Sequence, residues 1–414
     1  MKLLQSEHRA GGSLPSTLLF GLSAVLLVVC IVYSPGEAFQ ASGQGLAIWW
    51  RIVFPALLPF LVLSEILLAS GFAHGLGVLL DPLTRKALGL PGTFAWILPL
   101  GITAGFPAAA AAAANLYKQG KISSQEAEKM ASVAHFGSPM LLVIVIGTGY
   151  MGLQELGLLL LAVHWVSGIA AGITLHLLSS NNRSKRKIEA HKTNFIPSRF
   201  LSRFRLAANQ MEEARAADGR GFGKLLGDAV GSSVQTLMTV GGYMLIFAVV
   251  IHVLNSALPE FIPSFSVAGL LEVHLGSYAA AQLSMPPVIV SAILGAILGW
   301  SGICAYLQVR SILKPAGIGS RFFIVNRLVH GAYAYVFTLL LWRPFSRWLP
   351  ETLPVSANTY NSGIATGATT RGSTFLPLPD WKQIANQFQH QMWLLLLLLA
   401  GLLVLSIVGK RRSR

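Results

Sequence analysis

Charged residues are scarce in this chain. Asp, Glu, Lys and Arg make up 11% of its 414 residues, whereas hydrophobic residues make up 53%. Soluble globular domains carry about a quarter charged residues, so this composition excludes a large soluble domain. At about 20 apolar residues per crossing, the chain is long enough for many membrane spans. We therefore predict an all-α, polytopic transmembrane protein in a lipid bilayer.

Cysteine and the familiar catalytic motifs are also missing. The two cysteines, Cys30 and Cys304, lie far apart in apolar stretches, where a cysteine is more often a small buried side chain than half of a disulfide. No His, Cys, Asp and Glu spacing matches a zinc site. We find no Walker-type phosphate loop, Gly-x-Ser-x-Gly elbow or His-Glu-x-x-His motif. We therefore expect no metal, no cofactor and no enzymatic activity.

Acidic residues are outnumbered by basic ones. The chain has 31 Lys and Arg against 16 Asp and Glu, a formal net charge of +15. The basic residues concentrate between apolar segments, in residues 181–224 and in the tail 410–414. Basic loops stay cytoplasmic in membrane proteins, so we predict that both segments are cytoplasmic. Because membrane topology explains this distribution, we do not expect nucleic acid as a partner.

Apolar length predicts nine candidate spans. Nine full crossings would place the two termini on opposite sides of the membrane. A re-entrant hairpin at 93–116 would return the N-terminus to the cytoplasm, and the sequence leaves both topologies open. The candidate spans are 14–33, 48–71, 93–116, 137–153, 156–178, 228–256, 284–304, 322–342 and 391–409.

Composition divides the chain into six parts. The linker is expected to be partly helical over 204–217, and the polar loop is rich in Ser, Thr, Asn and Gly. The parts are an N-terminal transmembrane segment (1–45), a first transmembrane half (46–180), a basic cytoplasmic linker (181–224), a second transmembrane half (225–342), a polar loop (343–390) and a C-terminal transmembrane helix with a basic tail (391–414).

The two halves contain similar interruptions. The first has Gly105-Phe106-Pro107 inside an apolar segment, and the second has Gly299-Trp300-Ser301-Gly302. His135 follows Gly105 by 30 residues, and His330 follows Gly299 by 31. Paired Gly- or Pro-interrupted segments in corresponding halves are typical of a transporter binding site. We therefore predict two related halves with broken or re-entrant helices around a central site.

The first interruption has two interpretations. Pro107 suits the first turn of a helix, and the free N–H groups that follow would attract an anion at membrane depth. Alternatively, the proline kinks a tightly packed helix, because Pro and Gly are common in membrane helices.

Two carboxylates lie in otherwise apolar segments. Glu65 and Glu272 would each be costly at membrane depth, so each is expected to face a cavity or a partner. The functional roles would be proton carrier, sodium ligand or hydrogen-bond acceptor for a solute, and the alternative is a protonated or paired structural carboxyl. Other polar residues near the interruptions could orient a small ligand in an apolar pocket. The candidate substrate-binding residues are Glu65, Gly105, Phe106, Pro107, His135, Ser138, Glu272, Gly276, Ser301 and Gln308.

At these residues the sequence resembles the YlbJ-type sporulation integral membrane proteins, which carry the nucleoside-recognition (Gate) domain. The resemblance covers about residues 45–340. Where the family typically has Gly-Tyr-Pro-Ser-Gly, this chain has Gly105-Phe106-Pro107-Ala108-Ala109, and it has His135-Phe136-Gly137 where the family has Asn-rich residues. The resemblance rests on Phe54-Pro55-Ala56-Leu57-Leu58-Pro59-Phe60, Ser64-Glu65-Ile66-Leu67, Gly105-Phe106-Pro107, Gly269-Leu270-Leu271-Glu272 with Gly276, and Ser301-Gly302 with Gln308.

The resemblance implies two Gate-like halves, similar to halves of concentrative nucleoside transporters. It also implies a transporter or channel for a small anionic solute, dipicolinic acid, in the outer forespore membrane during spore cortex formation. One alternative is a transporter of a nucleoside or another small metabolite. A second is a membrane scaffold that recruits cortex-building enzymes through residues 181–224. The sequence leaves the oligomeric state open, a homo-oligomer included.

Overall fold

The computed structural model describes residues 14–90, 94–106, 108–180 and 200–347. Over these residues the chain is helical and contains no strand, so the predicted all-α class is confirmed. The predicted C-terminal span at 391–409 and most of the polar loop lie outside the described residues. Five helical stretches are long and apolar enough to cross a membrane, which makes the protein polytopic. They are Pro35–Ala69, Gln154–Leu178, Phe222–Ala257, Pro287–Ala316 and Arg321–Ser346.

The N-terminal part contains a longer helix than the sequence predicts. The expected span 48–71 is the second part of a helical stretch that begins at Pro35, where a proline suits the first helical turn. A π-helical turn at Trp49–Val53 joins its two parts. The elements are α1 (Leu14–Tyr33), α2 (Pro35–Ile48), η1 (Trp49–Val53) and α3 (Phe54–Ala69).

The predicted span 93–116 is two short helices rather than one. Each contains 11 residues and so rises about 16 Å, roughly half the hydrocarbon thickness of a bilayer. Neither can cross alone, and this favours the broken arrangement over nine full crossings. The elements of the first half are α4 (Phe72–Leu88), α5 (Phe94–Ala104), α6 (Ala108–Lys118), α7 (Ser124–Val133), η2 (Leu141–Tyr150) and α8 (Gln154–Ser180).

The second half has a matching break between α13 and α14. The helix expected in the linker at 204–217 is present as α9, which packs against α4. The long helix α10 is followed by two short helices, α11 and α12, which pack closely together, and then by the second broken segment. The elements are α9 (Phe200–Asp218), α10 (Phe222–Ala257), α11 (Ser264–Leu271), α12 (Val273–Ala281), α13 (Pro287–Trp300), α14 (Gly302–Leu313), η3 (Lys314–Ala316) and α15 (Arg321–Ser346).

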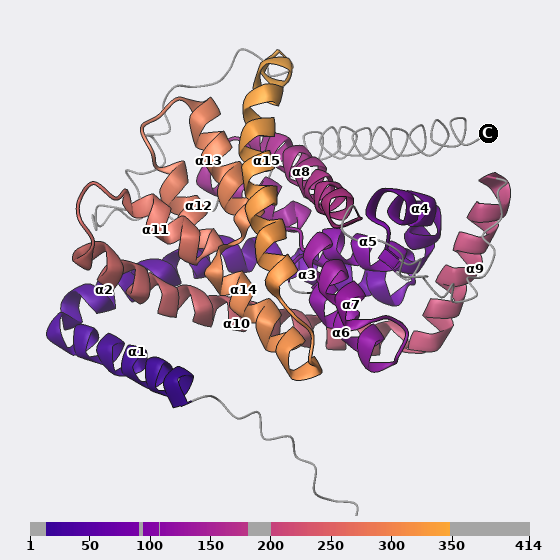
Figure 1. The fold of residues 1–414 in the computed structure, drawn as a ribbon, viewed down its shortest axis with the longest axis horizontal. Coiled ribbons are helices and arrows are strands. Elements are labelled where there is room, and N and C mark those ends of the chain that lie inside the picture. Colours follow the sequence, from indigo (N-terminus) through magenta and orange to yellow (C-terminus); the bar gives the residue numbers. More distant parts are fainter. Residues whose placement is uncertain (1–13, 91–93, 107, 181–199, 348–414) are drawn as a thin grey trace, which may run out of the picture.

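The two broken segments meet inside the molecule. The backbone is left-handed at both breaks, with φ of 72° at Gly105 and 68° at Ser301. Helices α6 and α14, which follow the breaks, pack against each other, and α7 packs against α15. Figure 1 shows the α5–α7 group beside the α11–α14 group, with α3 and α10 passing between and beneath them.

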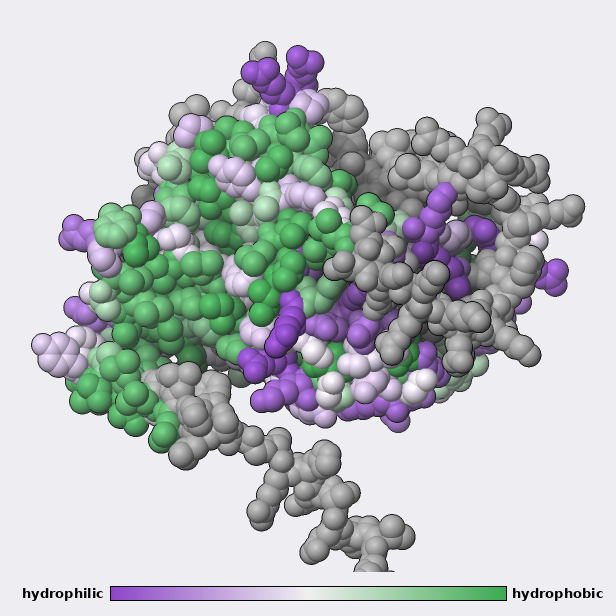
Figure 2. Space-filling model, viewed as in Figure 1, coloured by the Kyte–Doolittle hydropathy of each residue, from purple (hydrophilic) through white to green (hydrophobic). Residues whose placement is uncertain are grey.

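The outer surface of the described residues is suited to lipid. Leu22 on α1, Ile246 on α10 and Leu340 on α15 are large apolar side chains that are exposed. Figure 2 shows a broad hydrophobic surface over the side formed by α10–α15, with hydrophilic residues gathered toward its edges. A contiguous apolar surface of this extent would be unfavourable in water, and it indicates the face that the bilayer covers.

Candidate functional site

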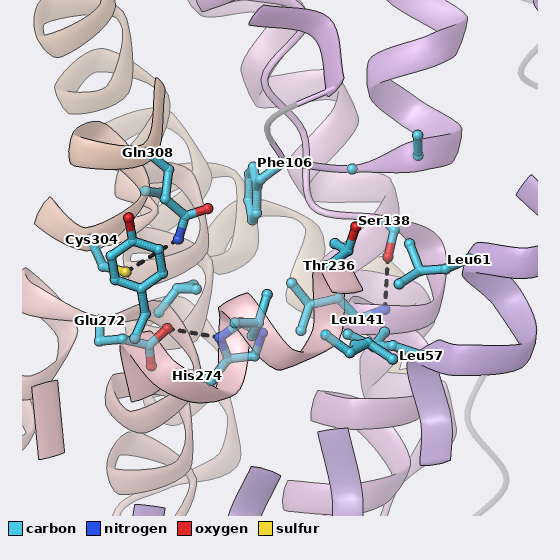
Figure 3. Close-up of a pocket in the computed structure, with 17 residues that line it drawn as sticks. Leu57, Leu61, Phe106, Ser138, Leu141, Thr236, Glu272, His274, Cys304 and Gln308 are labelled. Carbon is cyan, nitrogen blue, oxygen red and sulfur yellow. Dashed lines mark hydrogen bonds and ion pairs between the residues drawn. The ribbon is translucent and has the colours of Figure 1, made fainter. Parts of the chain in front are cut away.

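A cavity lies where the two halves meet. The space that it offers to the centres of water-sized molecules is about 70 Å³. The wall is formed by α3, the break between α5 and α6, the segment leading into η2, α10, the start of α12, and α14. Figure 3 shows side chains from these separate elements converging on one space. A concave, mostly apolar site with a few polar groups is the usual form of a small-molecule binding site.

The first break supplies Gly105 and Phe106 to the cavity. Gly105 ends α5 in the left-handed conformation, which costs a residue without Cβ little. A Cβ atom there would lie 3.3 Å from the Cβ of Ser138, which also lines the cavity. The ring of Phe106 packs on the ring of His135 with centroids 4.3 Å apart. Phe106 therefore separates the cavity from His135, and Pro107 lies outside the described residues.

Glu272 lies at the sharp turn between α11 and α12. It is 2% exposed and serves as the N-cap of α12, where its Oε2 accepts a hydrogen bond of 2.7 Å from the Leu275 N–H. An anionic cap at this position is stabilised by the positive end of the helix dipole. The other oxygen, Oε1, lies 2.8 Å from Nδ1 of His274. Glu272 and His274 both line the cavity.

Gly276 and Ser301 shape the site without lining the cavity. A Cβ atom on Gly276 would collide with the backbone of Gly269, so Gly276 allows α12 to fold back tightly on α11. Ser301 is fully buried, and its Oγ donates a hydrogen bond to the carbonyl of Trp300 at 2.6 Å. The indole N–H of Trp300 donates to the Leu270 carbonyl at 3.0 Å, which joins the α13–α14 break to the α11–α12 turn.

Gln308 lies on α14 and lines the cavity with Cys304, one turn earlier. Its Nε2 donates a hydrogen bond of 3.3 Å to the Cys304 sulfur. On the facing helix α10, Thr236 and Tyr243 add polar groups to the wall. These neutral groups can form hydrogen bonds with a polar solute in any orientation that the apolar wall permits.

His135 is buried behind Phe106 in a basic cluster. Arg327, His164 and His330 are each at most 1% exposed, and they lie around it. Nη1 of Arg327 donates to the His135 carbonyl at 2.7 Å. The rings of His164 and His330 have centroids 4.5 Å apart. None of these four residues lines the cavity.

Glu65 faces a partner rather than the cavity. Its carboxylate is 3.5 Å from Nη2 of Arg220, and its side chain is 35% exposed. Arg220 also binds Asp218 at 2.7 Å and Asp228 at 3.3 Å, at the junction of α9 and α10. The hydrogen bonds from Arg220 hold the pKa of the Asp218 carboxyl below its ordinary value. This arrangement matches the paired alternative that the sequence left open for Glu65.

The structure thus brings together half of the predicted site. Gly105, Phe106, Ser138, Glu272 and Gln308 line one cavity. Four polar wall residues escaped the sequence analysis, and two signals could have found three of them. His274 follows an intramembrane carboxylate by two residues, and Thr236, Val240 and Tyr243 lie at helical spacing on one face. The residues that were missed are Thr236, Tyr243, His274 and Cys304.

The charge of the cavity wall is unusual for an anion site. Within the described residues no Lys or Arg lines it, and Glu272 is its one carboxylate. No group of three or more His, Cys, Asp or Glu residues that could hold a metal ion occurs in the described part of the chain. The chemistry that the wall offers is hydrogen bonding, aromatic contact and the titratable pair Glu272–His274.

Comparison with known proteins supplies the family. Residues 50–154 match the Gate family, described as nucleoside recognition. The chain is 33% identical over 352 residues to the sporulation integral membrane protein YlbJ of Bacillus subtilis (strain 168), covering 80% of this chain and 85% of that protein. No solved structure matches significantly. The Gate match covers the first break and both helices around it. This chain is therefore a member of the YlbJ family of sporulation integral membrane proteins, with a Gate domain in its first half.

Proposed function

We propose that this protein moves a small, planar, polar solute across a membrane during sporulation, and that the cavity between its halves is the binding site. The observation that carries the proposal is the meeting of two left-handed breaks, at Gly105 and Ser301, beside one cavity. In secondary transporters, discontinuous helices place their free termini and unwound backbone at the solute site near the bilayer midplane. The Gate match and the YlbJ relationship are consistent with this role.

Dipicolinic acid is our first candidate for the solute. The resemblance implies it, and the cavity offers two features that suit it. The N-terminal turn of α14 reaches the cavity wall at Cys304, where the positive end of the helix would attract a carboxylate. The Phe106 ring lines the same space and can stack on a pyridine ring. The outer forespore membrane, with spore cortex formation as the process served, is the location that the same resemblance implies.

A neutral solute such as a nucleoside is the second candidate. The observation that favours it is the Glu272 carboxylate in a wall that has no Lys or Arg within the described residues. At a separation of about 5 Å and an effective dielectric constant near 20, two like charges repel by about 3 kcal/mol. A nucleoside would avoid this cost and could donate hydroxyl hydrogen bonds to Glu272.

A scaffold for cortex enzymes would depend on residues 181–224 rather than on the cavity. The described part of this segment includes α9, which packs against α4 and leads into the ion pairs of Arg220. Deletion of 181–199 is expected to abolish scaffolding and to leave transport largely intact. The opposite result, loss of solute uptake with normal enzyme recruitment, would exclude the scaffold.

Uptake into proteoliposomes tests the proposal. Labelled pyridine-2,6-dicarboxylate and labelled uridine are each added to vesicles that contain the wild-type chain or Glu272→Gln. We expect the wild type to take up one of these solutes and the variant to lose at least tenfold in rate. Wild-type protein that is folded but takes up neither solute, and binds neither, would overturn the proposal. The solute that competes better for uptake decides between the two candidates.

A further inference from the structure

The pair of Glu272 and His274 is the one titratable acid–imidazole pair on the described cavity wall. Glu272 is 2% exposed and His274 is 7% exposed, so water screens both poorly. The 2.8 Å contact joins Oε1 of Glu272 to Nδ1 of His274. When Glu272 is ionised, its carboxylate only accepts hydrogen bonds, and the hydrogen of this contact then lies on Nδ1. Figure 3 shows the two side chains joined at the cavity wall.

Nε2, the second ring nitrogen of His274, is therefore the atom that can gain or lose a proton. With Nδ1–H committed to Glu272, a neutral His274 presents an unprotonated Nε2, and the one side-chain hydrogen bond of His274 among the described residues is the bond through Nδ1. A proton on Nε2 would convert the ring from an acceptor into a cationic donor. The same proton would neutralise the negative charge of the pair as a whole.

Few other titratable side chains lie near His274. The elements packed against α12 are α10, α11, α13, α14 and η2. Beyond Glu272, the titratable groups that they and α12 itself place near the pair are phenols and one thiol, and within the described residues none is cationic. They are Tyr150 on η2, Tyr243 on α10, Tyr278 on α12 and Cys304 on α14. Phenols and thiols are ordinarily neutral at neutral pH, so the imidazole is the basic nitrogen group at this part of the wall.

We propose that His274 binds the proton that accompanies an anionic solute through the cavity. The inference rests on the proposed function, and it addresses the repulsion between Glu272 and an anion. The proton enters from the side where the solute binds and attaches to Nε2 of His274. The Nε2–H then donates to a carboxylate of the solute, while Nδ1–H stays on Glu272. Release of the solute on the other side returns the proton to that side, so solute and proton move together.

The test measures proton movement and solute uptake in the same vesicles. Proteoliposomes with the full chain enclose a pH-sensitive dye, and pyridine-2,6-dicarboxylate is added at pH 6, 7 and 8 with equal pH on both sides. This solute is predominantly a dianion over that range, so its own titration changes little. We expect uptake to acidify the interior and its initial rate to fall as pH rises, by at most tenfold per unit for one proton.

The decisive variant is His274→Asn. Its amide nitrogen can replace Nδ1 as the donor to Glu272, but it offers no atom that binds a proton at Nε2. We expect residual uptake in this variant to be independent of pH and to move no protons. The matched control is His252→Asn on α10, where His252 lies 3.2 Å from Glu37 and away from the cavity. The control is expected to keep the wild-type pH profile.

The outcomes separate this inference from the proposed function. Wild-type uptake without proton movement, uptake coupled to sodium alone, or an unchanged pH profile in His274→Asn would each overturn the role of His274 and leave transport standing. If His274→Asn does not fold, calorimetry of wild-type binding in buffers of different ionisation enthalpy counts the protons bound with the solute. A count of zero at pH 7 overturns the inference. An absence of both binding and uptake by folded wild-type protein overturns the proposed function itself.

Discussion

Nη1 of Arg327, on α15 in the second half, donates a hydrogen bond of 2.7 Å to the carbonyl of His135 in the first half. Nη2 donates to the Ser132 carbonyl at 2.9 Å, and the Gly299 carbonyl lies 3.5 Å from Nη1. These carbonyls lie near the C-terminal ends of α7 and α13, where backbone acceptors lack helical partners and the helix dipole is negative. Arg327 therefore holds a helix end from each half, and no carboxylate among the described residues pairs with it.

Removal of this guanidinium should destabilise the contact between the halves. Arg327→Met keeps most of the side-chain length but removes the donor to the buried His135 carbonyl, at about 1–3 kcal/mol for an orphaned group, whereas the Ser132 carbonyl still accepts a hydrogen bond from Nδ2 of Asn326. We expect a lower thermal unfolding midpoint in detergent, measured by tryptophan fluorescence. Arg310→Met is the matched control, because Arg310 is exposed on α14 and surface substitutions change stability by about 0.5 kcal/mol or less. Equal midpoints for the two variants would argue against the role of Arg327.

The two intramembrane carboxylates should differ in their importance for transport. Glu65→Gln removes a partly exposed ion pair with Arg220, and such pairs contribute about 0–1 kcal/mol. Glu272→Gln changes the cavity wall, the cap of α12 and the partner of His274. We expect Glu65→Gln to retain most uptake and Glu272→Gln to lose at least tenfold, with both inserted in the membrane to equal extents. The reverse order would place the solute site near α3 rather than at the α11–α12 turn.

The close approach of α11 and α12 predicts that Gly276 tolerates no side chain. Gly276→Ala would force Cβ into the backbone of Gly269 and displace the turn that carries Glu272. We expect reduced solute affinity and reduced stability, measured by binding and by thermal unfolding. The control is Gly242→Ala on α10, where no atom lies within 4 Å of the added Cβ. Alanine is the better helix former by about 1 kcal/mol, so the control should be neutral or slightly stabilising. If Gly276→Ala behaves like this control, the tight packing of the two helices is not required.

Phe106 should set affinity for a flat aromatic solute. Phe106→Leu keeps an apolar side chain against His135 but removes the ring from the cavity wall. Aromatic stacking contributes about 0.5–1.5 kcal/mol beyond the area buried, so the apparent KM is expected to rise about twofold to tenfold. Phe106→Tyr keeps the ring and restores the residue that is typical of the family at this position. An increase in KM of the same size in both variants would show that the ring does not contact the solute.

The overall class and the positions of both breaks follow from local properties of the chain. Apolar run length and low charge density specify helices in a bilayer, because no other structure satisfies the backbone there except a closed barrel. Gly105, and later Ser301 with Gly302, interrupt two of those runs through the left-handed backbone that each adopts. The helix in the linker was likewise predictable from its sequence, and α9 is found close to the expected bounds.

Only the tertiary structure decided which polar residues share the cavity. In sequence Glu65 and Glu272 look alike, each being a lone carboxylate among apolar residues. Their surroundings differ because Glu65 pairs with Arg220, 155 residues away in the sequence. Glu272 instead accepts a hydrogen bond from the Leu275 N–H of the helix that it caps, and it contacts His274. Arg327 gave no signal either, since its two shortest hydrogen bonds go to backbone carbonyls almost 200 residues distant. Hydropathy and backbone conformation are local quantities that a sequence carries directly, whereas the partner of a buried polar group depends on how separate helices pack.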